Sequence, residues 1–170
     1  DPYVAAADFV SDEKGVASAE DAVAGASDII AEQISDNPEF RKIIRELTLH
    51  NALVTSKAAS EEDSVYSLYY DFSEPASKIA NHRLLAINRG EKEGFLSVKL
   101  EMDKDIIYNY LIRKTVKSAD TPCGAVVKAA AEDAYERLIA PSVATEIRNI
   151  LTENAQEASI KVFSKNLNGL

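Results

Sequence analysis

The chain has 170 residues, of which 46% are hydrophobic and 28% are charged, and this composition is that of a globular protein rather than a disordered one. Its 28 acidic and 19 basic residues give a formal net charge of −9, which repels phosphate at long range and argues against uniform binding to nucleic acid. The single cysteine, Cys123, excludes an internal disulfide, and no run of about 18 apolar residues predicts a membrane span. We therefore expect a cytoplasmic location.

The two ends of the sequence predict that the chain is a fragment of a larger protein. The first residues, DPYVAAADFV, lack the basic start and the long apolar core of a signal peptide. The last residues, KVFSKNLNGL, form an apolar-periodic run with no clear capping signal beyond Gly169.

Two amphipathic helices are predicted in the first third of the chain. Ser18 followed three residues later by Asp21 is a helix-capping pattern, and the periodic run that follows extends to Ser35. Asn37 and Pro38 start the second helix, with proline in its first turn. The apolar stripes are Val23, Ala26, Ile30 and Ile34 in the first helix and Phe40, Ile43, Ile44 and Leu47 in the second. We expect these two helices to form a helical hairpin.

The middle of the chain is also predicted to be helical. Residues 55–64 are polar and small, which is compatible with a loop, but they contain neither Pro nor Gly, and of the two we favour an exposed helical turn. An apolar and aromatic stripe at helical spacing follows, which we expect to lie in the core: Val65, Tyr66, Leu68, Tyr69, Tyr70 and Phe72. Ser73 and Pro75 then begin a helix that runs to Arg89, where Gly90 supplies a left-handed end.

One short β element is predicted near residues 95–102. Apolar Leu96, Val98 and Leu100 alternate strictly with polar residues, which is typical of a half-buried strand. A strand needs a hydrogen-bonding partner, so we expect either a short nearby segment or a segment outside this sequence to pair with it.

Three more helices are predicted in the last third of the chain. Asp103 or Asp105 caps the first, and Pro122 begins the second, an alanine-rich helix that breaks near Pro141. The third is about 25 residues long. The expected inward-facing residues are Ile106, Ile107, Tyr110 and Leu111, then Val126, Val127, Ala130, Ala134 and Leu138, and finally Ile147, Ile150, Leu151, Ala155, Ala158 and Val162. The fold class is therefore mainly α: a multihelical region with helical hairpins and a short β element, divided into sub-lobes 1–54 and 55–170.

The sequence predicts neither an enzyme nor a metal site. His82 has acidic neighbours in the sequence, but no Ser or Cys nucleophile accompanies it at a recognised spacing. His50, His82 and Cys123 are far apart and match no metal-ligand pattern, and RGEKEG lacks the lysine of a phosphate-binding loop. We expect no catalytic residue, metal, cofactor or small-molecule substrate.

Residues 77–103 could have either of two roles, a contact with phosphate groups or a structural role. Lys78, Arg83, Arg89 and Lys92 make the segment locally basic and could contact a phosphate backbone, whereas ion pairs with Glu74, Glu91 and Glu93 are the more economical alternative. As a structural motif, His82 and Arg83 would fix the helix against a neighbouring element, and Gly90 and Gly94 would permit the turn into the strand.

Four segments stand in a characteristic order along the chain: SAEDAVAGASDIIAEQIS, YYDFSEPASKIANHRLLAINRGEKEGFLSVKL, AYERLIAPSVATEIRN and EASIKVFSKNL. From about Val16 to Leu167, the chain resembles the Tex family of bacterial transcription accessory proteins. The resemblance implies the helical region that precedes a ribonuclease-H-like domain of the YqgF type. Asn81 stands where the family commonly has serine, and Asn168 stands where it commonly has a basic residue.

By this resemblance, we expect a noncatalytic helical scaffold that positions YqgF-like, helix-hairpin-helix and S1 modules lying outside this chain. Nucleic acid would bind through the full-length protein, chiefly through its S1 module, and the transcription machinery is a further expected partner. Two alternatives stay open. A protein-protein docking module would expose a contiguous apolar patch above about 400 Å². Direct nucleic-acid contact through residues 78–92 would require the four basic side chains to share one exposed face.

Overall fold

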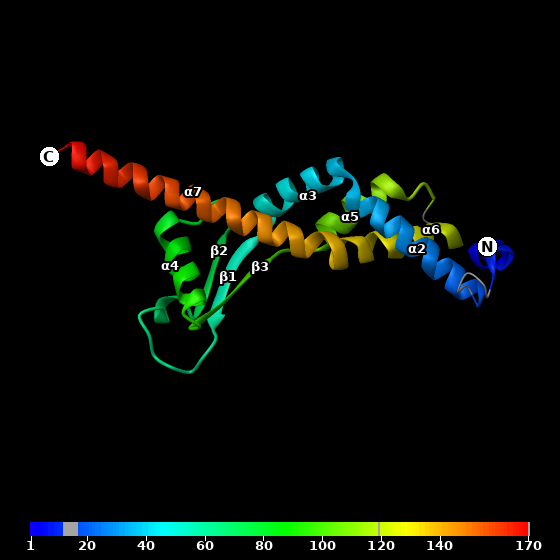
Figure 1. Ribbon diagram of the computed structural model, residues 1–170, viewed down its shortest axis with the longest axis horizontal. Helices are drawn as coiled ribbons and strands as arrows, with labels where there is room; N and C mark the ends of the chain where they lie inside the picture. The colour runs from blue at the N-terminus through cyan, green and yellow to red at the C-terminus, as the bar shows by residue number, and fades with distance from the viewer. Residues whose placement is uncertain (12–16, 119, 170) are drawn as a thin grey trace. The chain divides into compact units, whose positions relative to one another are not determined.

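The computed structural model describes residues 1–11, 17–118 and 120–169, and it confirms a mainly helical fold with a small β-sheet (Figure 1). The chain forms two compact units, and each unit combines two separate stretches of sequence. The first unit is Asp1–Ile44 with Lys104–Ser142, and the second is Arg45–Asp103 with Val143–Leu170. This division differs from the expected sub-lobes 1–54 and 55–170, because the chain leaves the first unit and later returns to it.

The first unit is built from helices. Its elements are α1 (Pro2–Ala6), η1 (Ala7–Phe9), α2 (Ala19–Asp36), the first half of α3 (Pro38–Asn51), α5 (Asp105–Thr115), α6 (Pro122–Asp133) and the π-helix η4 (Ala134–Ile139). Two predicted helix starts are confirmed. The Ser18 hydroxyl accepts a hydrogen bond from the Asp21 amide at 3.1 Å, and Pro38 begins α3. The predicted cap of α5 is wrong, because Lys104 occupies the N-cap position.

Small residues bring the helices of the first unit together. The main contacts of α2 are with α6, η4 and α1, rather than with α3 in the expected hairpin. Ala31, Ala130 and Ala134 are almost completely buried, and their short side chains allow a close approach of the helix backbones. The helices α5 and α6 form a consecutive packed pair.

The predicted break at Pro141 is wrong. The chain stays helical from α6 through η4 into α7 (Ala140–Asn168), and Pro141 is the second residue of α7. Proline lacks an amide proton and its ring crowds the preceding turn of a helix. The wider π turn directly before it, over Ala134–Ile139, accommodates this change without ending the helix.

The second unit contains a three-stranded antiparallel sheet. Its strands are β1 (Leu53–Ala58), β2 (Asp71–Pro75) and β3 (Leu96–Glu101), in the order β2-β1-β3. The prediction of β3 is confirmed, and its partner lies within the chain. Val54 of β1 is opposite Leu100, and Ser56 is opposite Val98.

Three helical predictions in this unit are wrong. The segment expected to be an exposed helical turn contains most of β1, and the helix expected to begin at Ser73 begins instead as α4 (Asn81–Lys92). The predicted aromatic stripe forms only the short 3-10 helix η3 (Ser67–Tyr69), and Phe72 lies in β2. Tyr66 of this stripe is buried, but Val65 and Leu68 are 86% and 84% exposed. The backbone of β1 is paired on both sides, and this pairing outweighs the weak local preference of the segment.

The core of the second unit lies between the sheet and the helices. Its buried residues are Ala52, Val54, Tyr66, Ala76, Ile87, Leu96 and Val98. Ile87 comes from α4, and Leu151 of α7 packs against the same cluster. Ile147 and Ala155 of the predicted α7 stripe are also buried. In the described part of the chain, no helix is long and apolar enough to cross a membrane.

Candidate functional site

The segment 77–103 forms a short helix followed by a strand. After β2, residues 76–80 lead into α4, whose first residue is Asn81. Leu84, Ile87 and Gly90 form the buried side of α4, and the chain then turns into β3. The opposite side of this helix is therefore the one available for contacts with other molecules.

Gly94, and not Gly90 as predicted, supplies the left-handed conformation at the end of α4. Gly94 has a φ of +85° and supplies the left-handed conformation, whereas Gly90 lies inside the last turns of α4. A Cβ atom on Gly90 would lie 2.6 Å from Cδ1 of Leu96 and 3.0 Å from the ring of Tyr66. Gly90 is thus required for close packing of α4 on the strand, and Gly94 is required for the turn.

Arg83 pairs with Glu74 at the end of β2, and this ion pair joins the first turn of α4 to the sheet. One oxygen of Glu74, Oε2, is buried and has no hydrogen-bond partner among the described residues. His82 lies beside Arg83 and is exposed. The arrangement fits the structural role predicted for Arg83, and the role of His82 stays a prediction.

Replacement of Arg83 by alanine is expected to lower the free energy of unfolding by about 0.5–1 kcal/mol, because the pair is partly exposed but its loss leaves Glu74 without a cation. Lys92→Ala, an exposed residue of the same helix, is the matched control and should change stability by less than about 0.5 kcal/mol. Thermal unfolding followed by circular dichroism measures both. Equal melting temperatures for wild type and Arg83→Ala would contradict a structural role.

The four predicted basic contacts are all exposed, but they do not share one face. Successive helix residues are rotated by about 100°, so Arg83 and Lys92 lie on opposite sides of α4, whereas Arg89 and Lys92 are neighbours three residues apart. Lys78 precedes the helix, and Arg83 is engaged by Glu74. Any phosphate contact would therefore depend mainly on Arg89 and Lys92.

Two acidic residues, Glu91 and Glu93, flank Lys92 in the sequence. Glu93 accepts a hydrogen bond from the Tyr66 hydroxyl at 2.8 Å. Burial raises the pKa of Tyr66, the hydrogen bond to Glu93 and the charge of that carboxylate raise it further, and the charge of Arg89 lowers it. Glu93 therefore places a negative charge at the C-terminal end of α4, where Arg89 and Lys92 also lie.

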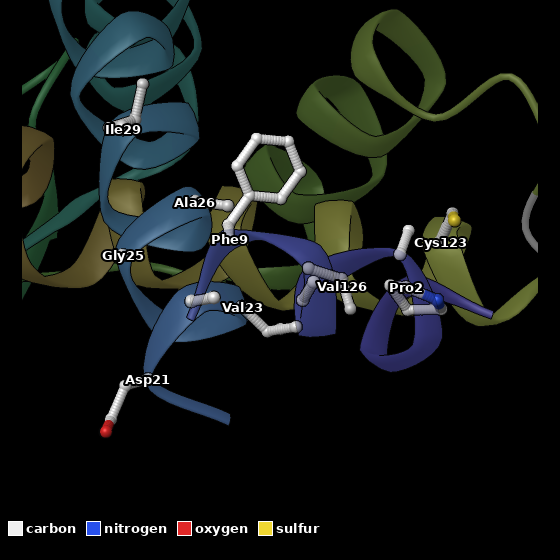
Figure 2. Close-up of a pocket in the computed structure, with 12 residues that line it drawn as sticks. Pro2, Phe9, Asp21, Val23, Gly25, Ala26, Ile29, Cys123 and Val126 are labelled. Atoms are coloured by element: carbon white, nitrogen blue, oxygen red, sulfur yellow. The ribbon is translucent and has the colours of Figure 1, made fainter. Parts of the chain in front are cut away.

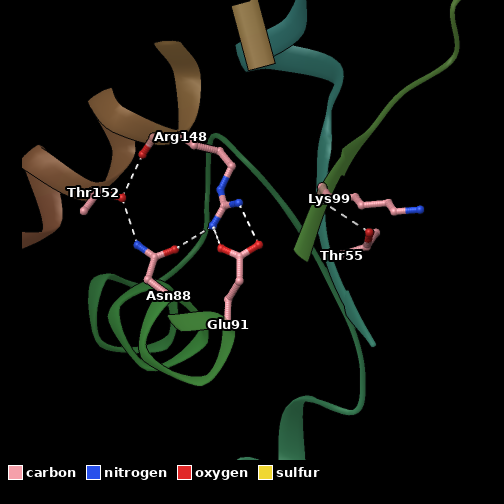
Figure 3. Close-up of polar contacts among 6 residues, drawn as sticks. All are labelled: Thr55, Asn88, Glu91, Lys99, Arg148 and Thr152. Carbon is pink, nitrogen blue, oxygen red and sulfur yellow. Dashed lines mark hydrogen bonds and ion pairs between the residues drawn. The ribbon is translucent and has the colours of Figure 1, made fainter. Parts of the chain in front are cut away.

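A polar clasp joins α4 to α7 and was not predicted. Arg148 of α7 donates to both oxygens of Glu91, at 3.1 and 2.5 Å, and also donates to Oδ1 of Asn88 at 3.1 Å (Figure 3). The Asn88 amide donates to the Thr152 hydroxyl at 2.8 Å, and that hydroxyl donates to the Arg148 carbonyl at 2.8 Å. We call these four residues, Asn88, Glu91, Arg148 and Thr152, the α4–α7 clasp.

The α4–α7 clasp is partly buried, and its polar side chains form hydrogen bonds with one another. The Arg148 and Glu91 side chains are 28% and 35% exposed. A bidentate pair between a planar guanidinium and a carboxylate fixes both distance and orientation. The only sequence signal was the spacing of Asn88 and Glu91 on α4 and of Arg148 and Thr152 on α7, each one helical turn apart. That spacing does not show that the pair on α4 contacts the pair on α7.

The first unit carries a separate polar cluster. Glu136 of η4 accepts hydrogen bonds from Tyr108 of α5 and from Lys104, the latter at 2.9 Å. Burial and the bond to Glu136 raise the pKa of Tyr108, and the bonds from Tyr108 and Lys104 lower the pKa of Glu136. These two bonds join Lys104 and α5 to η4 within the first unit.

Within residues 1–11, 17–118 and 120–169, no three His, Cys, Asp or Glu side chains converge in a way that could hold a metal ion. The described structure is that of a mainly helical region with a small sheet. The chain belongs to the Tex family: the family model described as Tex central region-like matches residues 1–163. The resemblance stated from the four sequence segments is therefore confirmed, although Val16, where it begins, lies outside the described residues.

Several curated relatives are similar over the length of this chain. It is 43% identical over 175 residues to "Uncharacterized protein YdcI" of Bacillus subtilis. The aligned region covers 100% of this chain and 24% of that protein. The chain is 28% identical to "Protein tex" of Bordetella pertussis, with 100% and 24% covered, and 30% identical to human "S1 RNA-binding domain-containing protein 1", with 94% and 18% covered. The chain thus spans about a quarter of the length of these relatives, or less.

Proposed function

We propose that this chain is a noncatalytic helical scaffold of a transcription accessory protein. In this proposal it acts in the cytoplasm and holds the nucleic-acid-binding parts of the complete protein, of the YqgF-like, helix-hairpin-helix and S1 types, in register. The names of its relatives support a role connected with transcription. They include a transcriptional accessory protein Tex of Neisseria gonorrhoeae and a transcription elongation factor SPT6 homolog of Arabidopsis thaliana.

The observation that carries the scaffold proposal is the α4–α7 clasp. α7 is a single helix of 29 residues, which is about 44 Å long at 1.5 Å per residue. The clasp and the contact of Leu151 with the core fix the first half of this helix on α4 and the sheet. Both contacts hold α7 at one rotation and one axial position. Fixed geometry is what a scaffold requires, and it needs no reactive group.

The charge distribution supports assigning nucleic-acid binding to other parts of the complete protein. The net charge is −9, and one of the four candidate basic contacts, Arg83, is already paired. Binding of a polyanion needs several unpaired cations on one surface, because affinity rises with the number of phosphates that are neutralised. Arg89 and Lys92 alone supply two.

We expect the 170-residue chain to show no saturable binding to labelled single-stranded or double-stranded DNA or RNA below about 100 µM protein at about 150 mM salt. Fluorescence anisotropy at two salt concentrations measures this, with a complete Tex-family relative as the positive control. Tight, salt-sensitive binding by the chain would overturn the proposal. If Arg89→Ala/Lys92→Ala then abolished that binding, this surface of α4 would be a nucleic-acid interface.

A further inference from the structure

An apolar cleft of about 600 Å³ opens in the first unit (Figure 2). Helices α1, η1, α2 and the start of α6 line it, through residues such as Ala6, Phe9, Val23, Ile29 and Val126. Phe9 and Ile29 are 73% and 57% exposed. Exposure of large apolar side chains to water is unfavourable, so their burial by another molecule lowers the free energy.

The cleft exists because one side of α2 has small residues. Ala22, Gly25 and Ala26 line it, and a Cβ atom built on Gly25 would meet no atom within 4 Å. The helix therefore leaves open space where a larger side chain would fill the cleft. This space suits the side chains of an incoming helix, which project at intervals of three and four residues into a groove between helices.

The charged residues that line the cleft, or that directly adjoin a lining residue in the described sequence, are all acidic, and we call them the acidic rim. Asp21 is the only charged residue among the described residues that line it. The residues adjacent in sequence to the lining residues include Asp1, Asp8, Glu20 and Asp28, and none of them is Lys or Arg. Asp28 pairs with Arg137 at 3.5 Å, whereas Asp8, Glu20 and Asp21 are exposed. Acidic groups beside an apolar surface favour a partner with cations beside its own apolar face.

We propose that this cleft is a docking site for a basic amphipathic helix, with an apolar stripe that enters the cleft and with Lys or Arg on both sides of the stripe. A polyanion such as nucleic acid does not match this surface, because its charge has the same sign as the rim. Docking of a helix here goes beyond the scaffold role and rests on different residues from the α4–α7 clasp. Either proposal can therefore fail without the other.

The test uses the 170-residue chain and two designed peptides. One is a fluorescent helix of about 15 residues with Leu at positions i, i+3, i+4 and i+7 and Lys elsewhere, and the other has Glu in place of Lys. We expect saturable binding of the Lys peptide by fluorescence anisotropy and at least about tenfold weaker binding of the Glu peptide. Equal binding of both peptides, or no binding of the Lys peptide, would overturn the proposal.

Two variants locate the binding site. Gly25→Leu adds a large apolar side chain at a position where a Cβ atom meets nothing within 4 Å. It should therefore weaken binding of the Lys peptide by at least about tenfold while leaving the melting temperature unchanged or higher. Undiminished binding by Gly25→Leu would place the peptide elsewhere and refute the cleft as its site. A concentration-dependent dimer that Gly25→Leu abolishes would show that a second copy of this chain fills the cleft, and this too would refute the proposal.

Charge variants test the acidic rim. Asp8→Asn/Asp21→Asn removes one charge from the cleft lining and one from the residue that precedes Phe9. It should weaken binding of the Lys peptide several-fold at low salt, with a smaller dependence on salt. The matched control, Glu153→Gln/Glu157→Gln, removes the same charge from exposed positions of α7 in the other unit. Equal losses in the two variants would mean that binding depends on net charge alone, contrary to the proposal.

Discussion

Replacement of Gly90 by alanine is expected to lower the free energy of unfolding by about 1–3 kcal/mol, although alanine is the better helix former. The added methyl group would lie 2.6 and 2.9 Å from the Leu96 side chain and 3.0 Å from the Tyr66 ring. Leu96 and Tyr66 are both core residues, 3% and 6% exposed, so neither can move into solvent without losing other contacts. Crowding therefore outweighs the gain of about 1 kcal/mol in helix propensity.

The matched control for this substitution is Gly25→Ala in α2. Gly25 is also inside a helix, but a Cβ atom there meets nothing within 4 Å, so only the gain in helix propensity remains. We expect Gly25→Ala to raise the free energy of unfolding by about 0.5–1 kcal/mol. Because the chain has two units, hydrogen exchange of α4 and of α2 should be measured beside thermal unfolding. Stability changes of the same sign at both glycines would contradict the packing explanation.

Replacement of Arg148 by alanine is expected to cost about 1–2 kcal/mol, between the values typical of exposed and of buried ion pairs. The substitution leaves the partly buried Glu91 carboxylate without its cation and removes the donor to Asn88. In a domain of this size, such a loss lowers the melting temperature by about 2–8 °C. Hydrogen-exchange protection of α4 and of the first half of α7 should fall together.

Arg113→Ala is the matched control for Arg148→Ala. Arg113 is exposed and donates to the carbonyl of Asn109 in its own helix, so its removal should cost less than about 0.5 kcal/mol. A double-mutant cycle between Arg148 and Glu91 measures their coupling directly, and we expect about 1 kcal/mol or more. A coupling near zero would show that the pair adds nothing to the attachment of α7, and the scaffold proposal would lose its main support.

Local sequence signals predicted three helix starts and one strand. Three of the predicted helices begin where the cap at Ser18 and the prolines at positions 38 and 122 indicate. The alternating residues of β3 form a strand, as predicted. Each signal acts within about four residues, through a side-chain hydrogen bond, a fixed φ angle or the period of a strand. The four segments that resemble the Tex family were likewise visible without a structure.

Distant contacts decided the positions where prediction was wrong. β1 lacks a turn signal at either end, and it becomes a strand because β2 and β3 pair with its two edges. The helix predicted from Ser73 lost its first residues to β2 for the same reason. Backbone hydrogen bonds to partners far along the chain outweigh a local helical preference of a few tenths of a kcal/mol per residue.

The sequence by itself determined the helical class of this protein, the helix starts at Ser18, Pro38 and Pro122, one strand and its family. Only the tertiary structure decided which side chains meet: Arg148 with Glu91 across 57 residues, Gly90 with Leu96 and Tyr66, and the small residues of α2 that leave the apolar cleft open. Caps and periodicity are local properties that a short window of sequence contains. Clasps, close approaches and clefts depend on the path of the chain between the partners, and no short window contains that path.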